Sequence, residues 1–334
     1  MRSRLLSLAL LIAAAGFPAN AAPLIGGPKT ISLDADGNIP GVVVSTQMGM
    51  GYVKGAKQVA VPLVAVAFET AAMAKTTHGS GGKITTKSLE MHLLIDEKVL
   101  QAIADQLQTM VEKDLAAQGF EILPKESVDH EARWTGIAKN DPIGTEVGDN
   151  FMSGFGGNGT KNRWFTAGNR PLFGTGAQAA LSETSPLIRT AREKKFTLLF
   201  YRFKVQFTSI DAKNNLLFSS VKGENGLHML NADLAVFTPE NTQGGIFKLK
   251  ANVTAGADFV KELRELPRGG AEVAGVQMSA ALQSLLSGAA TTATSSKNSG
   301  HYAVLADPEL YKSGSLALIH AASRQFAQAL RKAQ

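Results

Sequence analysis

A long alternating segment at residues 196–210 constrains the fold more than any other part of the sequence. Apolar and polar side chains alternate along it, with Leu199, Tyr201, Phe203, Val205 and Phe207 on one parity and Arg202, Lys204, Gln206 and Thr208 on the other. Because successive side chains of a strand point to opposite faces, this pattern predicts a long strand with an aromatic buried face and a wetter, basic face. A helix would scatter the same rings around its circumference. We therefore expect a sheet built around this strand.

The first 21 residues have the three parts of a secretory signal peptide. Arg2 and Arg4 precede an apolar run at residues 5–15, and Ala19, Asn20 and Ala21 supply small residues at the usual cleavage spacing. The run is about half of the roughly 20 apolar residues that a membrane-spanning helix needs. We expect a periplasmic or secreted protein, cleaved near Ala21, with no transmembrane segment in the mature chain.

The composition excludes several classes of site and partner. The 334 residues contain no cysteine, which excludes disulfides, thiolate metal sites, a cysteine nucleophile and a lipidated amino-terminal cysteine. The net charge is +6, and it falls to +4 once Arg2 and Arg4 leave with the signal peptide. A mild, dispersed excess of this kind is typical of a solvated surface, so we expect no nucleic-acid partner.

Strand and helix patterns before residue 125 predict the first half of the sheet. Residues 57–69 form a strand whose apolar parity shifts at Pro62, which indicates a bulge or an edge position. Residues 76–83 are rich in glycine and predict a loop, and residues 89–94 predict another strand. Residues 96–118 carry an apolar stripe at helical spacing, capped by Asp96 and ended by Gly119.

The second half of the chain is predicted to complete an α+β fold. The expected elements are an irregular insertion at about 125–180, a helix from Ser185, strands at 216–222, 227–237 and 245–254, helices at 259–266 and 277–286, and a flexible linker at 288–300. A last helix is expected from Pro308, with Asp307 as its cap. The predicted fold is a mixed β-sheet with amphipathic helices packed mainly on one face. We interpret residues 22–56 as an extension and 57–334 as one elaborated domain.

Motifs for catalysis are weak in this sequence. Residues 154–159 satisfy G-x-G-x-x-G, but no apolar strand precedes them and no helix follows, so we expect a flexible loop and no nucleotide cofactor. No two of the six histidines are three or four residues apart, and we expect no metal site. A hydrolase assembled from distant loops, with His130, Glu131 and Asp149 as its members, remains the alternative.

The candidate binding site lies in the aromatic, glycine-rich segment 151–173. Phe155, Arg163, Trp164 and Phe165 are predicted to form a docking surface for a partner protein, a cell-wall component or an apolar ligand, because tryptophan and arginine are enriched at such surfaces. The alternative is that these rings fold back and cover the sheet as a small satellite core.

The order of elements resembles a family of exported α/β modules. Four places carry the resemblance: the strand at residues 59–64, the helix 96–118 with the following Gly119-Phe120, the helix and strand at 188–203, and the strand, acidic turn and strand at 230–247. The family includes the curli secretion channel protein CsgG, the amino-terminal domain of TolB and the LpoB activators of peptidoglycan synthases. Its members mostly bind or assemble envelope components, and CsgG and LpoB are anchored through a cysteine that this chain lacks.

The resemblance and the missing catalytic motifs predict an exported, non-catalytic envelope protein that binds a partner protein or a cell-envelope component. A periplasmic carrier of an apolar small molecule and the loop-assembled hydrolase are the alternatives.

Overall fold

Long β-strands dominate the structure, a computed structural model that describes residues 30–41, 43–48, 53, 56–80, 83–124, 143–144, 146–149, 157–169, 185–214, 219–256, 258–266, 292–294 and 299–334. The described strands join in one 14-stranded sheet that contains both parallel and antiparallel pairs. The predicted α+β fold with a mixed sheet is therefore confirmed. The alternating segment that anchored the prediction lies in β8, which runs from Thr197 to Asn214.

The strands differ widely in length. They are β1 (Thr30–Ser32), β2 (Val44–Met48), β3 (Gln58–Ser80), β4 (Lys83–Leu94), β5 (Glu121–Ile122), β6 (Glu146–Asp149), β7 (Gly157–Thr166), β8, β9 (Ser219–Thr238), β10 (Asn241–Leu249), β11 (Asn252–Gly256), β12 (Val260–Glu265), β13 (Thr292–Thr294) and β14 (Ser299–Ala306). The main order across the sheet is β1-β11-β9-β8-β3-β4-β14-β12. Two strands pair with four others each: β3 pairs with β4, β5, β7 and β8, and β9 pairs with β8, β10, β11 and β13.

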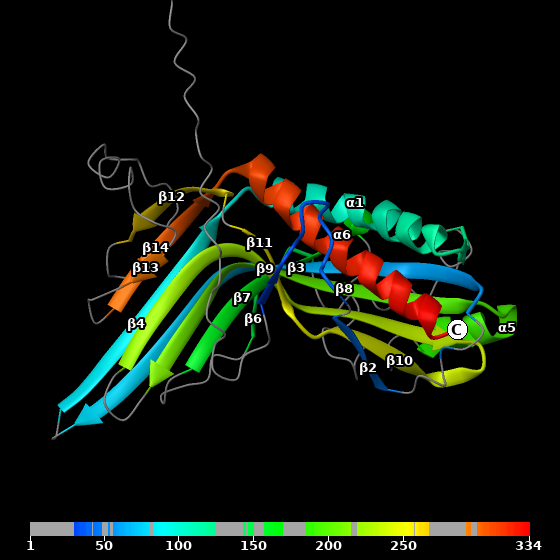
Figure 1. The fold of residues 1–334 in the computed structure, drawn as a ribbon, viewed down its shortest axis with the longest axis horizontal. Coiled ribbons are helices and arrows are strands. Elements are labelled where there is room, and N and C mark those ends of the chain that lie inside the picture. Colours follow the sequence, from blue (N-terminus) through cyan, green and yellow to red (C-terminus); the bar gives the residue numbers. More distant parts are fainter. Residues whose placement is uncertain are drawn as a thin grey trace, which may run out of the picture.

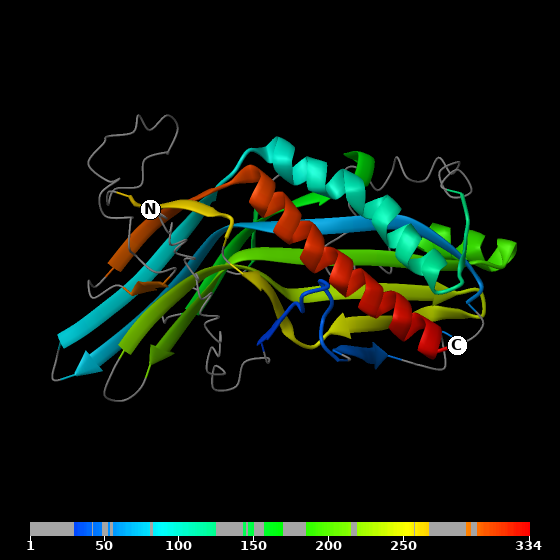
Figure 2. The ribbon, with the colours of Figure 1, turned by 45° about the horizontal axis from the view of Figure 1, so that its top comes forward.

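Two helices cover one face of part of the sheet. Helices α1 (Glu97–Ala117) and α6 (Pro308–Lys332) lie side by side on that face, as the two views of the ribbon show (Figure 1, Figure 2). Beneath them, the ring of Phe326 lies 6.2 Å from that of Tyr201 and 6.5 Å from that of Phe203. The aromatic face of β8 is thus the face that α6 buries.

The opposite face of the sheet carries a smaller core. Helix α5 (Ser185–Lys194) packs there, with Leu187 and Ile188 against Leu198 and Phe200 of β8. These β8 residues have the parity opposite to Tyr201, as the strand period requires. The helices therefore divide between the faces, with α1 and α6 on one and α5 on the other.

The parity shift predicted at Pro62 is a register irregularity in the structure. The pairing of β3 with β8 shifts between Ala60 and Leu63, so that Val61 and Val64 both join the core beneath α1 and α6 while Leu63 joins the α5 side. The extra residue bends the strand locally.

Beyond α1 and α6, strands β3, β4, β8 and β9 continue as long hairpin arms (Figure 1). At the start of this extension the β3–β7 register shifts between Glu69 and Ala71, and the β8–β9 register shifts on both sides of Gln206. The pairing of β3 with β8 ends at Phe68. Since bulges strengthen twist and bend a strand, these irregularities at one level account for the bend of the sheet.

The predicted helix ends are confirmed. Asp96 precedes α1 and accepts a hydrogen bond from the backbone N–H of Lys98 at 2.9 Å, and Gly119 follows with a φ of 83°. Asp307 caps α6 in the same way, accepting from the N–H groups of Glu309 and Leu310 at 3.0 Å. Each cap satisfies donors that a helix start leaves free.

Several element predictions are wrong. Within the helix expected at 259–266, residues 260–265 form strand β12, which is antiparallel to β14. Pairing with a neighbouring strand overrides a short helical spacing of apolar residues. The expected loop at 76–83 is mostly strand, since β3 continues to Ser80 and β4 begins at Lys83. Strand β9 is continuous where two strands were expected, and the expected strand 245–254 divides between β10 and β11.

Parts of the predicted irregular segments are also strands. Strands β6 and β7 lie within residues 125–180, and β13 and the first residues of β14 lie within 288–300. The helix expected at 277–286 and the signal peptide lie outside the described residues. None of the described helices combines the length and the hydrophobicity that crossing a membrane requires.

Candidate functional site

A pocket lies where the last turns of α6 pass the strands β2 and β10. These strands are antiparallel, with Phe247 opposite Thr46 and Leu249 opposite Val44. Among the described strands, β2 pairs with β10 alone, so its other edge carries no described partner. Helix α6 contacts both strands, and the pocket lies between the helix and these strands.

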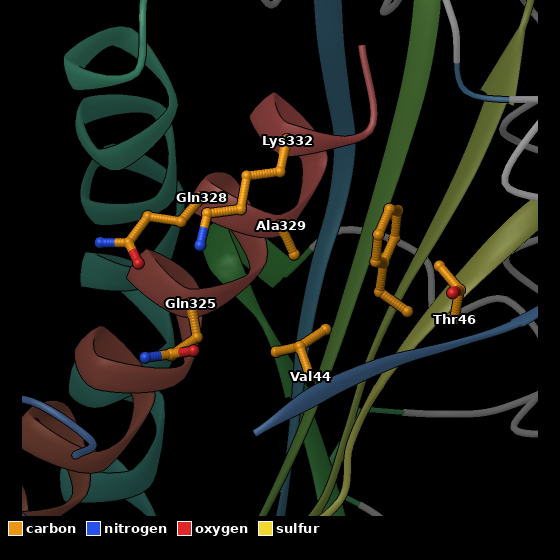
Figure 3. Close-up of a pocket in the computed structure, with 7 residues that line it drawn as sticks. Val44, Thr46, Gln325, Gln328, Ala329 and Lys332 are labelled. Atoms are coloured by element: carbon orange, nitrogen blue, oxygen red, sulfur yellow. The ribbon is translucent and has the colours of Figure 1, made fainter. Parts of the chain in front are cut away.

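The floor and inner walls of the pocket are apolar. Val44 and Thr46 project from β2 and Ala329 projects from α6 toward the space between them, and Phe247 lines the pocket from β10 (Figure 3). The pocket holds about 160 Å³ and is open to solvent. Phe247 is buried, so it forms a fixed base that does not have to move when something enters.

The rim of the pocket is polar and comes from α6. Gln325, Gln328 and Lys332 lie there (Figure 3). Gln325 is already engaged, since its Nε2 donates to the carbonyl of Gly41 at 2.9 Å. Gln328 and Lys332 are exposed, and neither forms a hydrogen bond or ion pair with another residue that the structure describes. Within the described part of the chain, the rim therefore offers the positive charge of Lys332 and the amide of Gln328 to a ligand.

The sequence-predicted binding residues are distributed over both faces of β7. Phe165 is 1% exposed and packs against Phe68 with ring centroids 5.8 Å apart, so its ring leaves no surface for a partner. Trp164 points to the other face and is half-buried against the core beneath α5. Arg163 reaches the first turn of α1, with its Nη1 3.4 Å from Glu97 Oε2.

The strand alternation therefore separates Trp164 from Phe165 instead of joining them in one surface. Phe155 lies outside the described residues. Binding of a partner by Arg163 and Trp164 stays a prediction.

The residues of the hydrolase alternative are hardly described. His130 and Glu131 lie outside the described residues, and Asp149 is the last residue of β6, with its side chain outside them. That alternative also stays a prediction.

A polar cluster that the sequence analysis missed lies on the outer face of β4 and β14. Glu90, His92 and His301 place one possible ligand atom each within 4.8 Å of one another. The signal was the Glu-x-His spacing, which puts both side chains on one face of a strand. This spacing alone does not indicate a metal site, because the third side chain, His301, comes from a distant part of the chain.

Two buried ionisable groups have strongly shifted pKa values near the bend. Burial raises the pKa of the Glu69 carboxyl to about 7, although the side chain of Gln206, the charge of Lys204 and the backbone N–H groups of Phe207 and Thr208 act in the opposite direction. Burial also lowers the pKa of His228 to about 4. Both groups are enclosed in the fold and line no described pocket, so we interpret them as structural.

Comparison of the chain with models of protein families, with curated proteins and with solved structures finds no match. Function has to be inferred from the chemistry of the described residues.

Proposed function

We propose that this protein is an exported, non-catalytic binding protein of the cell envelope, which holds a partner polypeptide by accepting one apolar side chain of the partner in the pocket beside α6. The observation that carries the proposal is the open pocket of about 160 Å³ with an apolar base and a rim of free polar groups. A preformed pocket that receives one anchor side chain is a common device in protein recognition.

The volume of the pocket favours a side chain over a small molecule. Sites for drug-sized ligands hold roughly 300–1,000 Å³, and a cavity of about 150 Å³ accommodates a molecule the size of benzene. At about 160 Å³, the pocket matches the side chain of one leucine or phenylalanine. It is too small for a lipid chain with its head group, so the carrier alternative gains no support from it.

The rim favours an acidic group beside the apolar anchor. Lys332 brings three N–H donors and a positive charge, and Gln328 brings an amide. A carboxylate next to the anchor can pair with Lys332, whereas a lysine or arginine there would be repelled. We therefore assign the occupant as an extended segment of a partner protein in which a leucine or phenylalanine is followed by aspartate or glutamate.

The exposed edge of β2 fits an extended partner. Strand β2 pairs with β10 alone among the described strands, and an unpaired strand edge is a surface to which an extended segment can add. Val44 and Thr46 line the pocket from this same strand. An extended segment running along β2 would thus lie beside the pocket that takes its side chain.

Export and the envelope location rest on the amino-terminal pattern of residues 1–21 and on the resemblance to envelope modules. Fractionation of expressing cells, with mass spectrometry of the mature amino terminus, tests this part. The expected result is a periplasmic or secreted chain that begins at Ala22; a cytoplasmic chain that retains Arg2 and Arg4 would contradict it.

Peptide binding tests the pocket directly. We expect fluorescently labelled hexapeptides with a central phenylalanine followed by aspartate to bind with a dissociation constant of about 10–500 μM, as one anchored side chain and an exposed charge pair allow. Matched peptides with alanine in place of phenylalanine, or lysine in place of aspartate, should bind at least tenfold more weakly.

Variants of the chain then locate the binding. Ala329→Phe fills the pocket and Lys332→Glu reverses the charge at its rim, and each should weaken the aspartate peptide about tenfold or more. Lys332→Glu should also reverse the preference between the aspartate and lysine peptides. The control is Leu310→Phe, which alters an exposed position of the same helix away from the pocket. Binding that is equal in all variants would refute the assignment.

A further inference from the structure

We propose that Glu90, His92 and His301 form a three-ligand site for a divalent transition-metal ion of the zinc class, on the outer face of β4 and β14. This inference goes beyond the proposed binding function and rests on residues outside the pocket. It needs no change in the fold, because all three side chains already converge.

The strand pairing explains why these side chains converge. Glu90 and His92 are two residues apart on β4, so they share the face opposite to Leu89, Met91 and Leu93, which belong to the core. Strand β14 runs parallel to β4 with His301 opposite Glu90 in the register. Backbone hydrogen bonds between paired strands fix the positions of the ligand side chains that the strands carry. A metal site requires such rigid positioning.

The distances are close to those of a metal complex. His92 Nε2 lies 2.9 Å from Glu90 Oε1, and the rings of His92 and His301 are 5.0 Å apart at 67°. Zinc bonds of about 2.0–2.1 Å place neighbouring tetrahedral ligands about 3.3 Å apart. With all three ligand atoms within 4.8 Å of one another, modest side-chain rotations bring them to that spacing.

One nitrogen atom of the cluster has no hydrogen-bond partner in the described part of the chain. The Nε2 atom of His301 is buried and forms no hydrogen bond with the residues that the structure describes. Buried polar atoms in native proteins nearly always have a partner, so this nitrogen calls for one. A metal ion bound between His301, His92 and Glu90 would supply it.

The charges around the cluster suit a cation. The side chain of Glu90 contributes a carboxyl group to the cluster, and its Oε1 lies 2.9 Å from His92 Nε2. The nearby Lys161 is itself paired with Glu146, its Nζ lying 3.0 Å from Glu146 Oε1. Two imidazoles and one carboxylate favour Zn²⁺, Co²⁺, Ni²⁺ or Cu²⁺ over Ca²⁺ and Mg²⁺, which prefer oxygen ligands.

Solvent can reach the site, and the bound ion would join two strands. The side chains of His92 and Glu90 are 30% and 40% exposed, so an ion can enter without opening the fold. The ion would link β4 to β14, which are distant in sequence and paired in parallel. Three protein ligands leave a fourth position for water or for a group from another molecule.

Titration of the untagged full chain with Co²⁺ tests the site. We expect one equivalent to bind with the visible ligand-field bands of low coordination number, to be displaced by Zn²⁺, and to resist an excess of Mg²⁺ or Ca²⁺. Glu90→Gln, His92→Gln and His301→Gln should each weaken binding at least tenfold. His320→Gln is the matched control, because His320 lies on α6 beside Asp114 and outside the cluster.

A further variant separates loss of a ligand from loss of the fold. His92→Cys replaces the imidazole with a thiolate ligand, so it should retain Co²⁺ and add an intense sulfur-to-metal charge-transfer band in the near ultraviolet. Failure of the unmodified protein to bind Co²⁺ stoichiometrically would overturn the proposal. The same holds if the three glutamine variants bind as tightly as the control, or if His92→Cys binds Co²⁺ without the charge-transfer band.

Discussion

The part of the sheet beneath α1 and α6 and the bend at which the hairpin arms begin are built by different physical rules. Beneath the helices, Tyr201, Phe203 and Phe326 are fully enclosed among apolar neighbours. At the bend, Glu69 and Thr208 are also buried, and the carboxylate of Glu69 accepts a hydrogen bond from Gln206 Nε2 at 3.0 Å. Apolar and aromatic contacts dominate the first region, whereas the bend encloses an ionisable carboxyl group among the strands.

The difference follows from the strand registers. Beneath the helices the period of two is unbroken along β8, so this strand presents a continuous apolar face to α6. At the bend, the pairing of β3 with β8 stops at Phe68, and the N–H groups of Phe207 and Thr208 face the Glu69 carboxylate. A buried backbone donor without a partner is costly, so an acceptor at residue 69 stabilises the point where the strands separate. The bend therefore depends on a buried polar side chain.

The largest expected effect lies beneath the helices. Phe326→Ala removes the ring that packs on Tyr201 and Phe203, and we expect it to lower the free energy of unfolding by about 3–5 kcal/mol. Urea titration followed by circular dichroism measures this change. Leu310→Ala, at a position 47% exposed on the same helix, should change stability by less than about 0.5 kcal/mol. Similar losses in both variants would show that α6 is not held by its aromatic contacts.

A smaller, pH-dependent effect is expected at the bend. Glu69 has its pKa raised from 4.5 to about 7 by burial, so between these values the folded chain binds more protons than the unfolded chain. Its contribution to stability is therefore fully present below about pH 4.5 and is lost as the pH rises through about 7. We expect Glu69→Gln, which stays neutral, to become more stable relative to the unmodified protein by about 2 kcal/mol between pH 5 and pH 8.

Urea titrations of both proteins at several pH values measure this difference. His228, whose pKa is lowered to about 4, destabilises the fold as the pH falls below 6.5, but it does so equally in both proteins and cancels from the comparison. If the difference in unfolding free energy between the two proteins does not change with pH, Glu69 is charged in the folded protein. The nearby charge of Lys204 would then be the group that favours its ionised form.

The region beneath the helices could be predicted from sequence because its signals are local. The aromatic parity of β8, the stripe and caps of α1, and the Asp307 cap of α6 each follow from spacing within one segment. The bend could not be predicted in this way. Its register shifts arise where β3, β7, β8 and β9 meet, and the role of Glu69 depends on Gln206, which is 137 residues away.

The sites were harder to predict than the fold for the same reason. The pocket combines Val44 and Phe247 with the end of α6, and the metal cluster combines Glu90 with His301. Neither set lies within one segment, so spacing reveals at most the pair Glu90 and His92 and never the complete site. The predicted pair Trp164 and Phe165 was adjacent in sequence, but the strand period sends the two rings to opposite faces.

The smallest effect on stability is expected at Arg163, which lies between the two regions. A variant at this position tests whether the side chain serves the fold or the binding of a partner. Its ion pair with Glu97 joins side chains that are 36% and 55% exposed, and such surface pairs contribute only about 0–1 kcal/mol. We expect Arg163→Gln to keep the unfolding free energy within about 1 kcal/mol of the unmodified value. If Arg163 belongs to a binding surface, the same variant should nevertheless lose its partner. Chemical cross-linking in intact cells, followed by purification of the protein, measures how much partner each variant retains.

Glu97→Gln provides the matched control, because it breaks the same ion pair from the side of α1 and leaves the guanidinium in place. Loss of the partner in Arg163→Gln but not in Glu97→Gln would assign the guanidinium to binding. If both variants retain the partner equally, Arg163 takes no part in binding. Its stretch of β7 would then have a structural role only, like the buried neighbour Phe165. The two variants can be compared directly because the exposed ion pair contributes little to stability. A loss of binding in Arg163→Gln therefore cannot result from unfolding.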